Sequence, residues 1–386
     1  MAVKSTIRKI AYVTGTRADF GLMKPVLDEI KKSKRLELKL YATGMHLMPE
    51  FGNTISLVKK YFSKVKRLEV KFGDDGRKAM AEFNAQLLKV IVKTFFQDKP
   101  DFVLTLGDRP EMLAAATACL YLGIPTGQVH AGDKTGTVDE IARHAITKLS
   151  HLHFPATQEA AQRVKRLGED AWRIKVVGAP ALDVILKEKL PSRQELFSDL
   201  GLAIKDKIIL VTQHPVSETI DSSDRQMATI LSAVQSFNLP VVMIYPNADA
   251  GSRGILKVIK EYSRYKNFYV FKNLEHKKFL ALAKEAAVWV GNSSAAMIES
   301  SSFKTPVVNI GPRQSGRQRG KNVINVDYNR SQIIKAINKS LFEKNYLGQF
   351  KSIKNPWGDG QAAKRIVKIL ERLPFDAKLL TKQITY

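Results

Sequence analysis

The chain has almost no cysteine. Cys119 is the single cysteine among 386 residues, and it lies in an alanine-rich apolar run. A disulfide within the chain is therefore excluded, which fits a protein that works in a reducing compartment. A lone thiol among apolar neighbours is typical of a protein core, so we do not expect a cysteine nucleophile.

Long hydrophobic runs are missing as well. No stretch approaches the roughly 18 apolar residues that a membrane-spanning helix needs. The apolar segment 10–13 is far shorter than the core of a secretory signal. We therefore expect a soluble, cytoplasmic protein with no membrane partner.

Two common phosphate-binding signatures are also absent. The glycines within 15–21 do not have the G-x-G-x-x-G spacing, and no Walker A lysine motif occurs. Both signatures depend on glycines at fixed offsets, where the backbone must approach a phosphate closely. Dinucleotide-binding and P-loop functions therefore lose their main support.

Acidic residues are outnumbered in this sequence. There are 62 lysines and arginines against 37 aspartates and glutamates, which gives a formal net charge of +25. The lysines are spread along the chain and form no basic tail, so solvated basic faces explain the charge and no nucleic-acid partner is expected. A basic cleft would favour an anionic ligand such as a nucleotide diphosphate.

Short apolar runs alternate with amphipathic stretches, a pattern that predicts parallel sheets with helical crossovers. The length suits two domains of about 190 residues each. We place an N-terminal Rossmann-like domain at 1–186 and a C-terminal one at 187–365, with the charged segment 187–202 as linker. The expected strands are 10–14, 36–42, 102–106, 126–130, 153–156 and 175–177, then 208–212, 241–245, 268–271, 288–290 and 307–310. The expected helices include 78–97, 109–122, 295–303 and 362–373.

The segment 101–148 carries the strongest chemical signal. Asp108 directly follows the strand 102–106, and Asp133 comes just after the next strand. Asp139, Glu140 and His144 lie shortly beyond. Charged groups at the carboxyl ends of parallel strands lie where open α/β folds bind ligands. Carboxylates at two consecutive strand ends predict acid/base chemistry on a neutral or anionic substrate.

In the second series of strands, Ser293 and Ser294 stand between a strand and a helix. Serine is a helix N-cap residue, and the free amides of a first helical turn bind anions. Glu299 lies more than a turn deeper, where a carboxylate can accept both hydroxyls of a ribose. An ordinary capped helix with a surface glutamate is the alternative.

Other polar residues follow the remaining strands. Arg313 lies in a glycine-containing loop and suits phosphate contact, although a solvated loop is the alternative. His214 ends the first strand of the second series, where a neutral core histidine is the alternative. Arg17 and His46 follow the first two strands of the chain. Because all these strand ends meet one cleft, the set indicates a binding site more strongly than any member does alone.

Taken together, the motifs resemble those of the hydrolysing UDP-N-acetylglucosamine 2-epimerases of sialic and related nonulosonic acid synthesis. The resemblance runs in order from about residue 10 to 365. It rests on GTRADFG at 15–21, TGMHL at 43–47, GDR at 107–109, RHAITKLSH at 143–151, YPN at 245–247, NSS at 292–294 and RQSGR at 313–317. It implies an α/β fold of GT-B architecture, with two Rossmann-like domains facing a central cleft. It also implies that the helical tail 366–386 returns to the first domain.

The resemblance implies a UDP-sugar substrate, a UDP product, no metal or other cofactor, and a homodimer or homotetramer. It implies catalytic roles for Asp108, Asp133, Asp139 and His144, with Glu140 as an alternative to Asp139. The essential pair is expected to be Asp108 and Asp133. The implied contacts to the UDP-sugar are Arg17, His46, Arg109, His214, Asn247, Ser293, Ser294, Glu299 and Arg313.

The chain departs from the family pattern at one acidic position. The usual Gly-Gly-Glu reads here Ala131-Gly132-Asp133, so the carboxylate stands on a side chain one methylene shorter. The substrate is therefore left open between UDP-GlcNAc and a UDP-2,4-diacetamido-trideoxy sugar. The residues are also compatible with a non-hydrolysing 2-epimerase, a GT-B glycosyltransferase or a nucleotide-sugar-binding protein without turnover.

Overall fold

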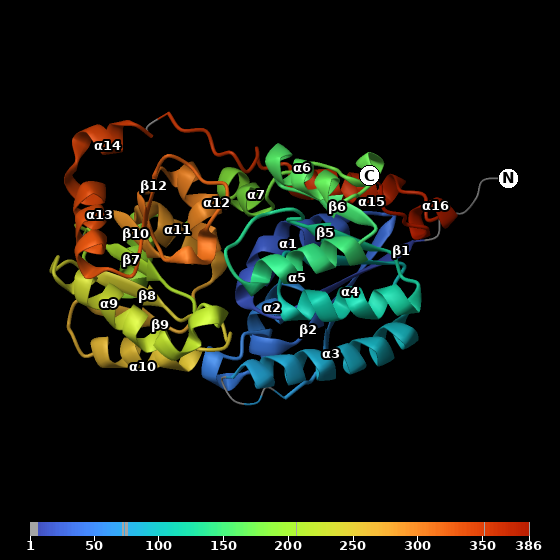
Figure 1. Ribbon diagram of the computed structural model, residues 1–386, viewed down its shortest axis with the longest axis horizontal. Coiled ribbons are helices and arrows are strands. Elements are labelled where there is room, and N and C mark those ends of the chain that lie inside the picture. The colour runs from blue at the N-terminus through green and yellow to red at the C-terminus, as the bar shows by residue number, and fades with distance from the viewer. Residues whose placement is uncertain (1–6, 72, 74–75, 206, 351, 386) are drawn as a thin grey trace.

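The computed structural model describes residues 7–71, 73, 76–205, 207–350 and 352–385, and these form two parallel six-stranded sheets side by side (Figure 1). The first half is built on the sheet β3-β2-β1-β4-β5-β6, with β1 (Arg8–Thr14), β2 (Leu36–Ala42), β3 (Val65–Arg67), β4 (Phe102–Leu106), β5 (Thr126–Val129) and β6 (Leu152–Phe154). The second half is built on β12-β11-β10-β7-β8-β9, with β7 (Ile209–Thr212), β8 (Val241–Ile244), β9 (Phe268–Phe271), β10 (Val288–Gly291), β11 (Val307–Ile310) and β12 (Val323–Val326).

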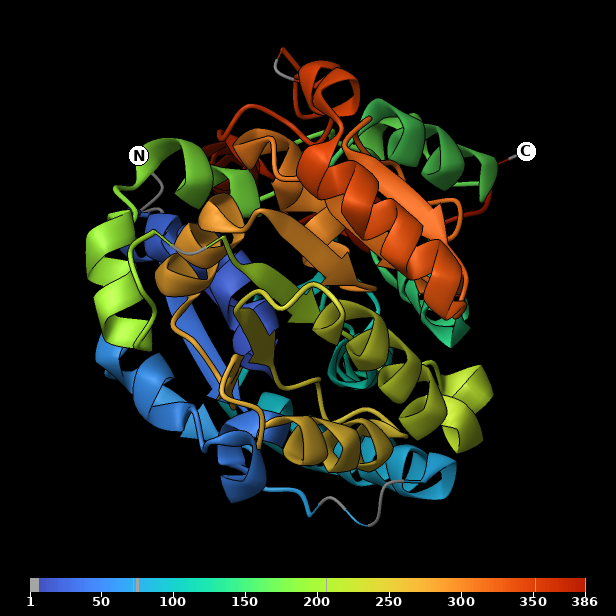
Figure 2. The same cartoon turned by 90° about the vertical axis from the view of Figure 1, so that its left-hand side faces the viewer.

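Helices cover both faces of each sheet, as Figure 2 shows for the second half. They are α1 (Arg17–Lys32), α2 (Ile55–Tyr61), α3 (Arg77–Asp98), α4 (Pro110–Leu122), α5 (Val138–Leu149), α6 (Gln158–Arg166), α7 (Ala181–Lys187), α8 (Arg193–Leu200), α9 (Ser223–Gln235), α10 (Ser252–Tyr262), α11 (His276–Glu285), α12 (Ser294–Phe303), α13 (Arg330–Phe342), α14 (Lys344–Gly348), α15 (Ala362–Arg372) and α16 (Ala377–Leu380). Single turns of 3-10 helix lie at η1 (Gly44–Leu47), η2 (Pro49–Phe51), η3 (Ala171–Arg173) and η5 (Pro312–Gln314), with a longer one at η4 (Ser217–Ser222). Because both sheet faces are covered, the central strands are apolar throughout, and β4 is buried at every position.

The strand order brings the carboxyl ends of β1, β4 and β5 to one edge of the first sheet. Ile10 of β1 pairs with Phe102 of β4, and Val103 of β4 pairs with Thr126 of β5. In the second sheet, β10 pairs in parallel with both β7 and β11. The loops that follow these strands face one another between the halves, which is where an open α/β fold places its ligand.

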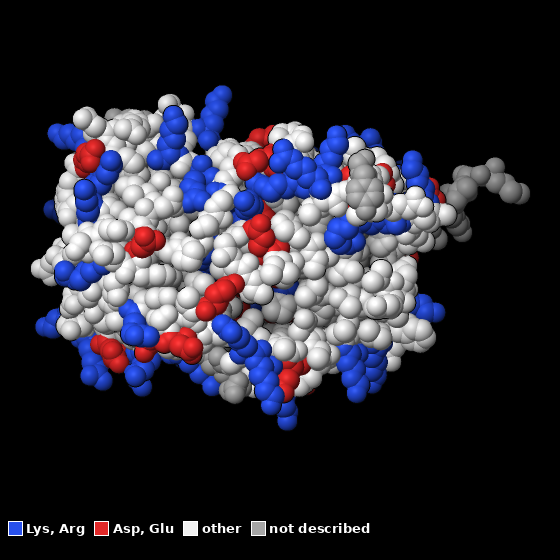
Figure 3. Space-filling view, viewed as in Figure 1, with Lys and Arg blue, Asp and Glu red and all other residues white. Residues whose placement is uncertain are grey.

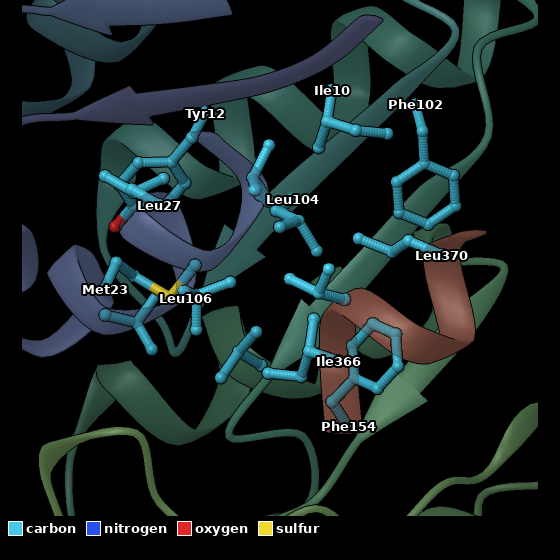
Figure 4. Packing of buried hydrophobic residues seen from close by; sticks show 14 of the residues in the cluster. Ile10, Tyr12, Met23, Leu27, Phe102, Leu104, Leu106, Phe154, Ile366 and Leu370 are labelled. Atoms are coloured by element: carbon cyan, nitrogen blue, oxygen red, sulfur yellow. The ribbon is translucent and has the colours of Figure 1, made fainter. Parts of the chain in front are cut away.

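The last long helix belongs to the core of the first half. The chain leaves the second half after α14, crosses over, and packs α15 against α1 (Figure 1). Ile366 and Leu370 of α15 are fully buried and lie with Phe102 and Leu104 of β4 in one cluster (Figure 4). Burial of such side chains stabilises by about 1.5–3 kcal/mol each, so α15 is an integral part of the first half.

The structure differs from the sequence prediction in four segments. The expected strand at 175–177 is absent, and only Ile174 forms a bridge, to His153. The edge strands β3 and β12 were not predicted, because their exposed, partly polar residues lack a long apolar run. The predicted linker 187–202 contains α8, which buries Leu196 and Phe197 against the second half.

The described residues contain no helix long and apolar enough to cross a membrane. Basic side chains are scattered over the face shown in Figure 3, and a few acidic side chains lie near the middle of that face. On this face the positive charge is thus distributed and forms no single patch, as the spacing of the lysines predicts.

Candidate functional site

A cavity of about 300 Å³ lies between the two halves. Its wall combines the loops after β4 and β5 with the starts of α1, α4 and α5, and across the cavity with α12 and the loops after β8 and β11. Of the residues predicted to form the site, those that line the cavity are Asp108, Arg109, Asp139, Asn247, Ser294 and Arg313. The structure thus brings predicted residues from both halves to one space.

Asp108 lies directly after Gly107, which ends β4 with a φ of +67° that favours glycine. The Asp108 side chain lines the cavity and forms an ion pair with Arg143 of α5. Arg143 is almost completely buried and also lines the cavity, so its guanidinium fixes the direction of the carboxylate. The ion pair with Arg143 therefore holds the Asp108 carboxylate in place beside the cavity.

Asp139 lies in the first turn of α5 and also lines the cavity. Burial and the nearby Asp108 carboxylate raise the pKa of Asp139 to about 6, although Arg313 opposes the shift. Arg313 Nη2 lies 3.4 Å from Asp139 Oδ2. A carboxyl with such a pKa holds a proton more readily than an ordinary aspartate and can act as a general acid.

Asp133 does not line the cavity, although it stands at the end of the adjacent strand. Its side chain is 1% exposed, and its Oδ2 lies 2.9 Å from His130 Nδ1 and 3.1 Å from Arg317 Nη2. Burial alone would raise the pKa of Asp133, but the hydrogen bond from His130 and the charges of Arg317 and Arg143 hold it at about 2. Asp133 is thus an ionised carboxylate, and its Oδ2 already has His130 and Arg317 as partners.

His144 and Glu140 form a pair on the outer side of α5. His144 Nε2 lies 3.6 Å from Glu140 Oε1, and burial lowers the pKa of His144 despite this neighbour. Glu140 Oε2 also accepts the backbone N–H of Thr135 at 2.7 Å, so it braces the loop that follows Asp133. Neither His144 nor Glu140 lines the cavity.

Two arginines of the first half were predicted to contact the diphosphate; Arg109 lines the cavity, whereas Arg17 does not. Arg109 Nη1 contacts Asp249 Oδ1 of the second half at 3.3 Å, and Arg109 Nε contacts Glu111 at 3.1 Å. Arg17 is half-buried, its buried Nη1 has no hydrogen-bond partner among the described residues, and burial lowers its pKa to about 10. A buried guanidinium with a free N–H group is suited to an anionic ligand.

In the second half, His214 holds the loop that carries Asn247. The N–H of Asn247 donates to His214 Nδ1 at 3.2 Å, and the N–H of His214 donates to Asn292 Oδ1 at 2.8 Å. Burial, with the neighbouring Arg313, lowers the pKa of His214 to about 3, so the ring is neutral at pH 7. Asn292 therefore ties the loop after β7 to the start of α12.

Ser293 is the N-cap of α12, and its own side chain makes no capping hydrogen bond. The first amides of the helix are thus open to an anion, with the hydroxyl of Ser294 beside them. One turn further along, Glu299 is 1% exposed and its Oε2 has no partner among the described residues. Burial raises the pKa of Glu299 to about 8.

His46 was predicted to contact the ligand, but its ring makes its contacts inside the first half. Its Nε2 lies 2.9 Å from Thr14 Oγ1 and its Nδ1 lies 2.8 Å from Thr54 Oγ1. Burial lowers the pKa of His46 to about 4. Both ring nitrogens therefore have partners within the first half, and the ring does not line the cavity.

Some residues of the site were not selected from the sequence. Asp249 and Arg143 make ion pairs within it, and His130 lines the cavity. Asn84 of α3 also lines the cavity, and its Oδ1 is buried without a partner among the described residues. A strand-end position could have indicated His130 and Asp249, whereas nothing in the pattern of α3 marks Asn84.

Ion pairs join the two halves across the cavity. Arg109 pairs with Asp249, Arg313 with Asp139, and Arg317 with Asp133. The N–H of Gly136 also donates to the carbonyl of Arg313 at 3.0 Å. The loop after β5 therefore touches the loop after β11, and the cavity is closed on that side.

No group of three or more His, Cys, Asp or Glu side chains among the described residues is arranged to hold a metal ion. The acidic side chains Asp108, Asp139 and Asp249 of the cavity instead form ion pairs with arginines. The arrangement combines acid/base carboxylates on one wall with an anion-binding helix start and arginines on the other.

Comparison with known proteins relates this arrangement to one family. The family model described as UDP-N-acetylglucosamine 2-epimerase matches residues 28–371. A Legionella pneumophila protein named UDP-N,N'-diacetylbacillosamine 2-epimerase (hydrolyzing) is 38% identical over 381 residues, covering 98% of this chain and 100% of that protein. The polysialic acid biosynthesis protein P7 of Escherichia coli is 32% identical, covering 95% of this chain and 94% of that protein.

Solved structures show the same fold. The UDP-GlcNAc 2-epimerase of Neisseria meningitidis, bound to UDP-GlcNAc, superimposes with a TM-score of 0.79 at 21% identity, covering 94% of this chain and 99% of that one. The Methanocaldococcus jannaschii enzyme, in complex with UDP-GlcNAc and UDP, gives a TM-score of 0.78 at 22% identity, with 94% and 99% covered. The predicted α/β fold with two Rossmann-like halves of GT-B type is therefore confirmed.

Proposed function

The chain belongs to the UDP-N-acetylglucosamine 2-epimerase family, and on that premise we propose that it is a hydrolysing 2-epimerase of UDP-2-acetamido sugars. One observation carries the proposal. A single cavity holds Asp108 and Asp139 on one wall and Ser294 and Arg313 on the other. Acid/base groups thus face an anion site across a space that one substrate molecule would occupy.

The nucleotide would bind on the second half. The free amides at the start of α12, with Ser293 and Ser294, would hold the diphosphate, and Glu299 would accept the ribose hydroxyls. Arg17 and Arg109 would close on the diphosphate from the first half. His214 and Asn247 would hold the nucleotide from the loops after β7 and β8. These donors would stabilise the charge that develops as the diphosphate leaves.

The sugar chemistry requires a base and an acid. The proton on C2 is weakly acidic, so its removal must be coupled to the departure of UDP from C1, which leaves a 2-acetamidoglucal. Water then adds its hydroxyl to C1, and C2 receives a proton on the opposite face. The pKa of Asp139, raised to about 6, suits the acid in this division of roles.

Two sugars are candidates for the substrate. One is UDP-GlcNAc, and the other is a UDP-2,4-diacetamido-2,4,6-trideoxy sugar, whose ring carries a methyl group in place of a hydroxymethyl. The cavity wall on α3 and α4 includes Met80 and Leu113, whose apolar side chains suit that methyl group. The 38% identity to a protein named for the diacetylated sugar supports the same choice.

The wider setting follows from the same resemblance. The product would be a free N-acetylmannosamine-type sugar for nonulosonic or sialic acid synthesis, made in the cytoplasm by a homodimer or homotetramer. Phe96 of α3 and Tyr121 of α4 are 69% and 84% exposed, and such large apolar side chains support self-association. Light scattering of the purified protein would give its molar mass and test the oligomer directly.

Proton NMR in heavy water tests the activity. Each candidate sugar is mixed with the protein, and the products are identified. UDP and a free 2-epimerised sugar deuterated at C2 would support the proposal. A UDP-linked epimer would instead indicate a non-hydrolysing enzyme. UDP release only with an added acceptor would indicate a glycosyltransferase, and UDP binding with no turnover of either sugar would indicate a binding protein.

A further inference from the structure

His130 has an unusual backbone for a residue at the end of a strand. It follows β5 with a φ of +60°, in the left-handed region that few residues other than glycine adopt. Its N–H still donates to the carbonyl of Phe154 at 3.0 Å, and its ring packs beside Trp357 with 5.9 Å between ring centroids. His130 is among the residues that line the cavity, and backbone conformations of this kind cluster at functional sites.

The contacts of the His130 ring indicate which of its two nitrogens carries the proton in the neutral form. Nδ1 lies 2.9 Å from Asp133 Oδ2, and an ionised carboxylate can only accept a hydrogen bond. Nδ1 therefore carries the proton, and in the neutral ring Nε2 has the free lone pair. Nε2 is buried and has no hydrogen-bond partner among the described residues. Because the ring lines the cavity, Nε2 is the polar atom left to meet a ligand.

Asp133 itself is held away from the cavity. Its side chain is 1% exposed, and its Oδ2 is shared between His130 and Arg317, whose guanidinium stacks over Trp357 at 5.6 Å. The side chain is one methylene shorter than the glutamate that the family pattern has at this position. The carboxylate can therefore reach a substrate only through the imidazole of His130.

We propose that His130 Nε2 is the group that takes the C2 proton of the sugar, and that Asp133 is its positioning partner. The inference rests on the proposed function. Nε2 accepts the proton, the C2–H electron pair forms the C1–C2 double bond, and the C1–O bond breaks with its electrons leaving on the diphosphate. The carboxylate of Asp133 stabilises the imidazolium, which returns its proton to solvent after UDP departs.

The experiment uses glycine at position 130 because glycine accepts the positive φ without strain. In His130→Gly, we expect kcat for UDP release to fall about 10²- to 10⁴-fold, with the affinity for UDP unchanged. Added imidazole should restore activity in proportion to its concentration, because it can occupy the vacated space beside Asp133. His130→Asn, which also tolerates a positive φ, should show the same loss if the glycine variant folds poorly.

His153 provides a matched control. It is also a fully buried histidine paired with a carboxylate, at 2.8 Å from Glu169, but it lies outside the cavity wall. His153→Gly should keep its kcat per folded molecule, and imidazole should not change it. Full activity of His130→Gly, or a loss that imidazole does not restore, would overturn the proposal.

The role of Asp133 has its own readout. In the double variant His130→Gly, Asp133→Asn, rescue by imidazole should be at least about tenfold weaker than in His130→Gly alone, because nothing orients the added ring. Equal rescue would show that Asp133 does not position the imidazole. If the unmodified protein turns over neither sugar, the proposed function fails; if it does and His130→Gly does too, only the inference about His130 fails.

Discussion

Arg313 Nη2 lies 3.4 Å from Asp139 Oδ2, so an arginine of the second half meets a carboxylate of the first half across the cavity. Both residues belong to segments that also meet through the backbone, from Gly136 N–H to the carbonyl of Arg313. The charge of the acid/base group therefore depends on how the two halves are closed. Opening the cavity would remove the arginine and leave Asp139 with its carboxylate neighbour Asp108.

The pH dependence of the reaction should report Asp139. Its pKa is raised to about 6, and a general acid must be protonated to act. We therefore expect kcat/KM to fall as the pH rises above about 6. Asp139→Asn should lower kcat about 10²- to 10⁴-fold and remove this limb. UDP release measured between pH 5 and 9 gives the profile, and a variant that keeps the same limb would contradict the assignment.

Replacing Arg313 should move the same limb. Arg313 lowers the pKa of Asp139, so its loss in Arg313→Gln raises that pKa and shifts the limb toward higher pH. Arg313→Lys keeps a positive charge and should shift it less. Both variants should also bind UDP more weakly. The pH at which kcat/KM begins to fall reports the pKa shift, whereas the overall height of the profile reports the loss of binding. If kcat/KM fell at the same pH in both variants, Arg313 would not contact Asp139.

Glu299 should make nucleotide binding release protons. Its pKa is raised to about 8 by burial, so at pH 7 the free protein holds this proton, whereas a carboxylate is the better acceptor for two ribose hydroxyls. UDP affinity should therefore rise as the pH increases toward 8. Calorimetry in buffers of different ionisation enthalpy measures the proton release.

The matched variant for this measurement is Glu299→Gln. It should release no proton and bind UDP about 10- to 100-fold more weakly, since hydrogen bonds to charged groups contribute about 1.5–3 kcal/mol. The variant should also lose the preference for UDP over 2'-deoxy-UDP. Equal discrimination in both proteins would mean that Glu299 does not contact the ribose.

Arg17 should contribute to the binding of UDP but not to the binding of uridine, which has no phosphate. Its buried Nη1 has no partner among the described residues, which predicts a contact with the diphosphate. Arg17→Met should weaken UDP binding about 10- to 100-fold, the range of a charged hydrogen bond, and should leave uridine binding unchanged. Titration of both ligands checks this. A parallel loss for uridine would point to a packing defect.

Stability in acid should depend on Glu169. This carboxylate accepts from Lys148 and Lys382 and lies beside His153, and although burial opposes them, these partners lower its pKa to about 2. A depressed carboxyl pKa stabilises the folded state above the unfolded value of 4.5, and this stability is lost as the pH falls toward 2.

Glu169→Gln should therefore lower the free energy of unfolding at pH 7 by about 3 kcal/mol, the cost of breaking a buried pair. Urea unfolding at pH 7 and pH 3 tests the sign. The difference between the two proteins should narrow at the lower pH. A difference that stays constant with pH would show that the charge of Glu169 is not the cause.

Much of the fold could be predicted because buried parallel strands leave a continuous apolar run. The run 102–106 matches β4 at both ends, and 36–42 matches β2. The edge strand β3 has no such run, since Lys66 and Arg67 face solvent. A strand that pairs on one side only is specified by its neighbour, and that neighbour cannot be read from the local sequence.

The site could be predicted in outline for a similar reason. Asp108 follows β4, Arg313 follows β11 of the other sheet, and Asp139 begins α5; the structure brings all three to one cavity. The sequence could not show that Asp133 turns away toward Arg317, because that contact joins residues far apart in the chain. It also could not distinguish His46, whose two ring nitrogens are occupied by threonines, from a histidine that faces a ligand.

The return of α15 to the first half has a consequence for biosynthesis. A chain made from its N-terminus completes the six strands of the first sheet at β6, yet Phe102 and Leu104 lack Ile366 and Leu370 until α15 leaves the ribosome. The second half, by contrast, has all its strands before α15 is made. The half that is translated first is thus the half that finishes folding last, with an apolar face that needs shielding in the meantime.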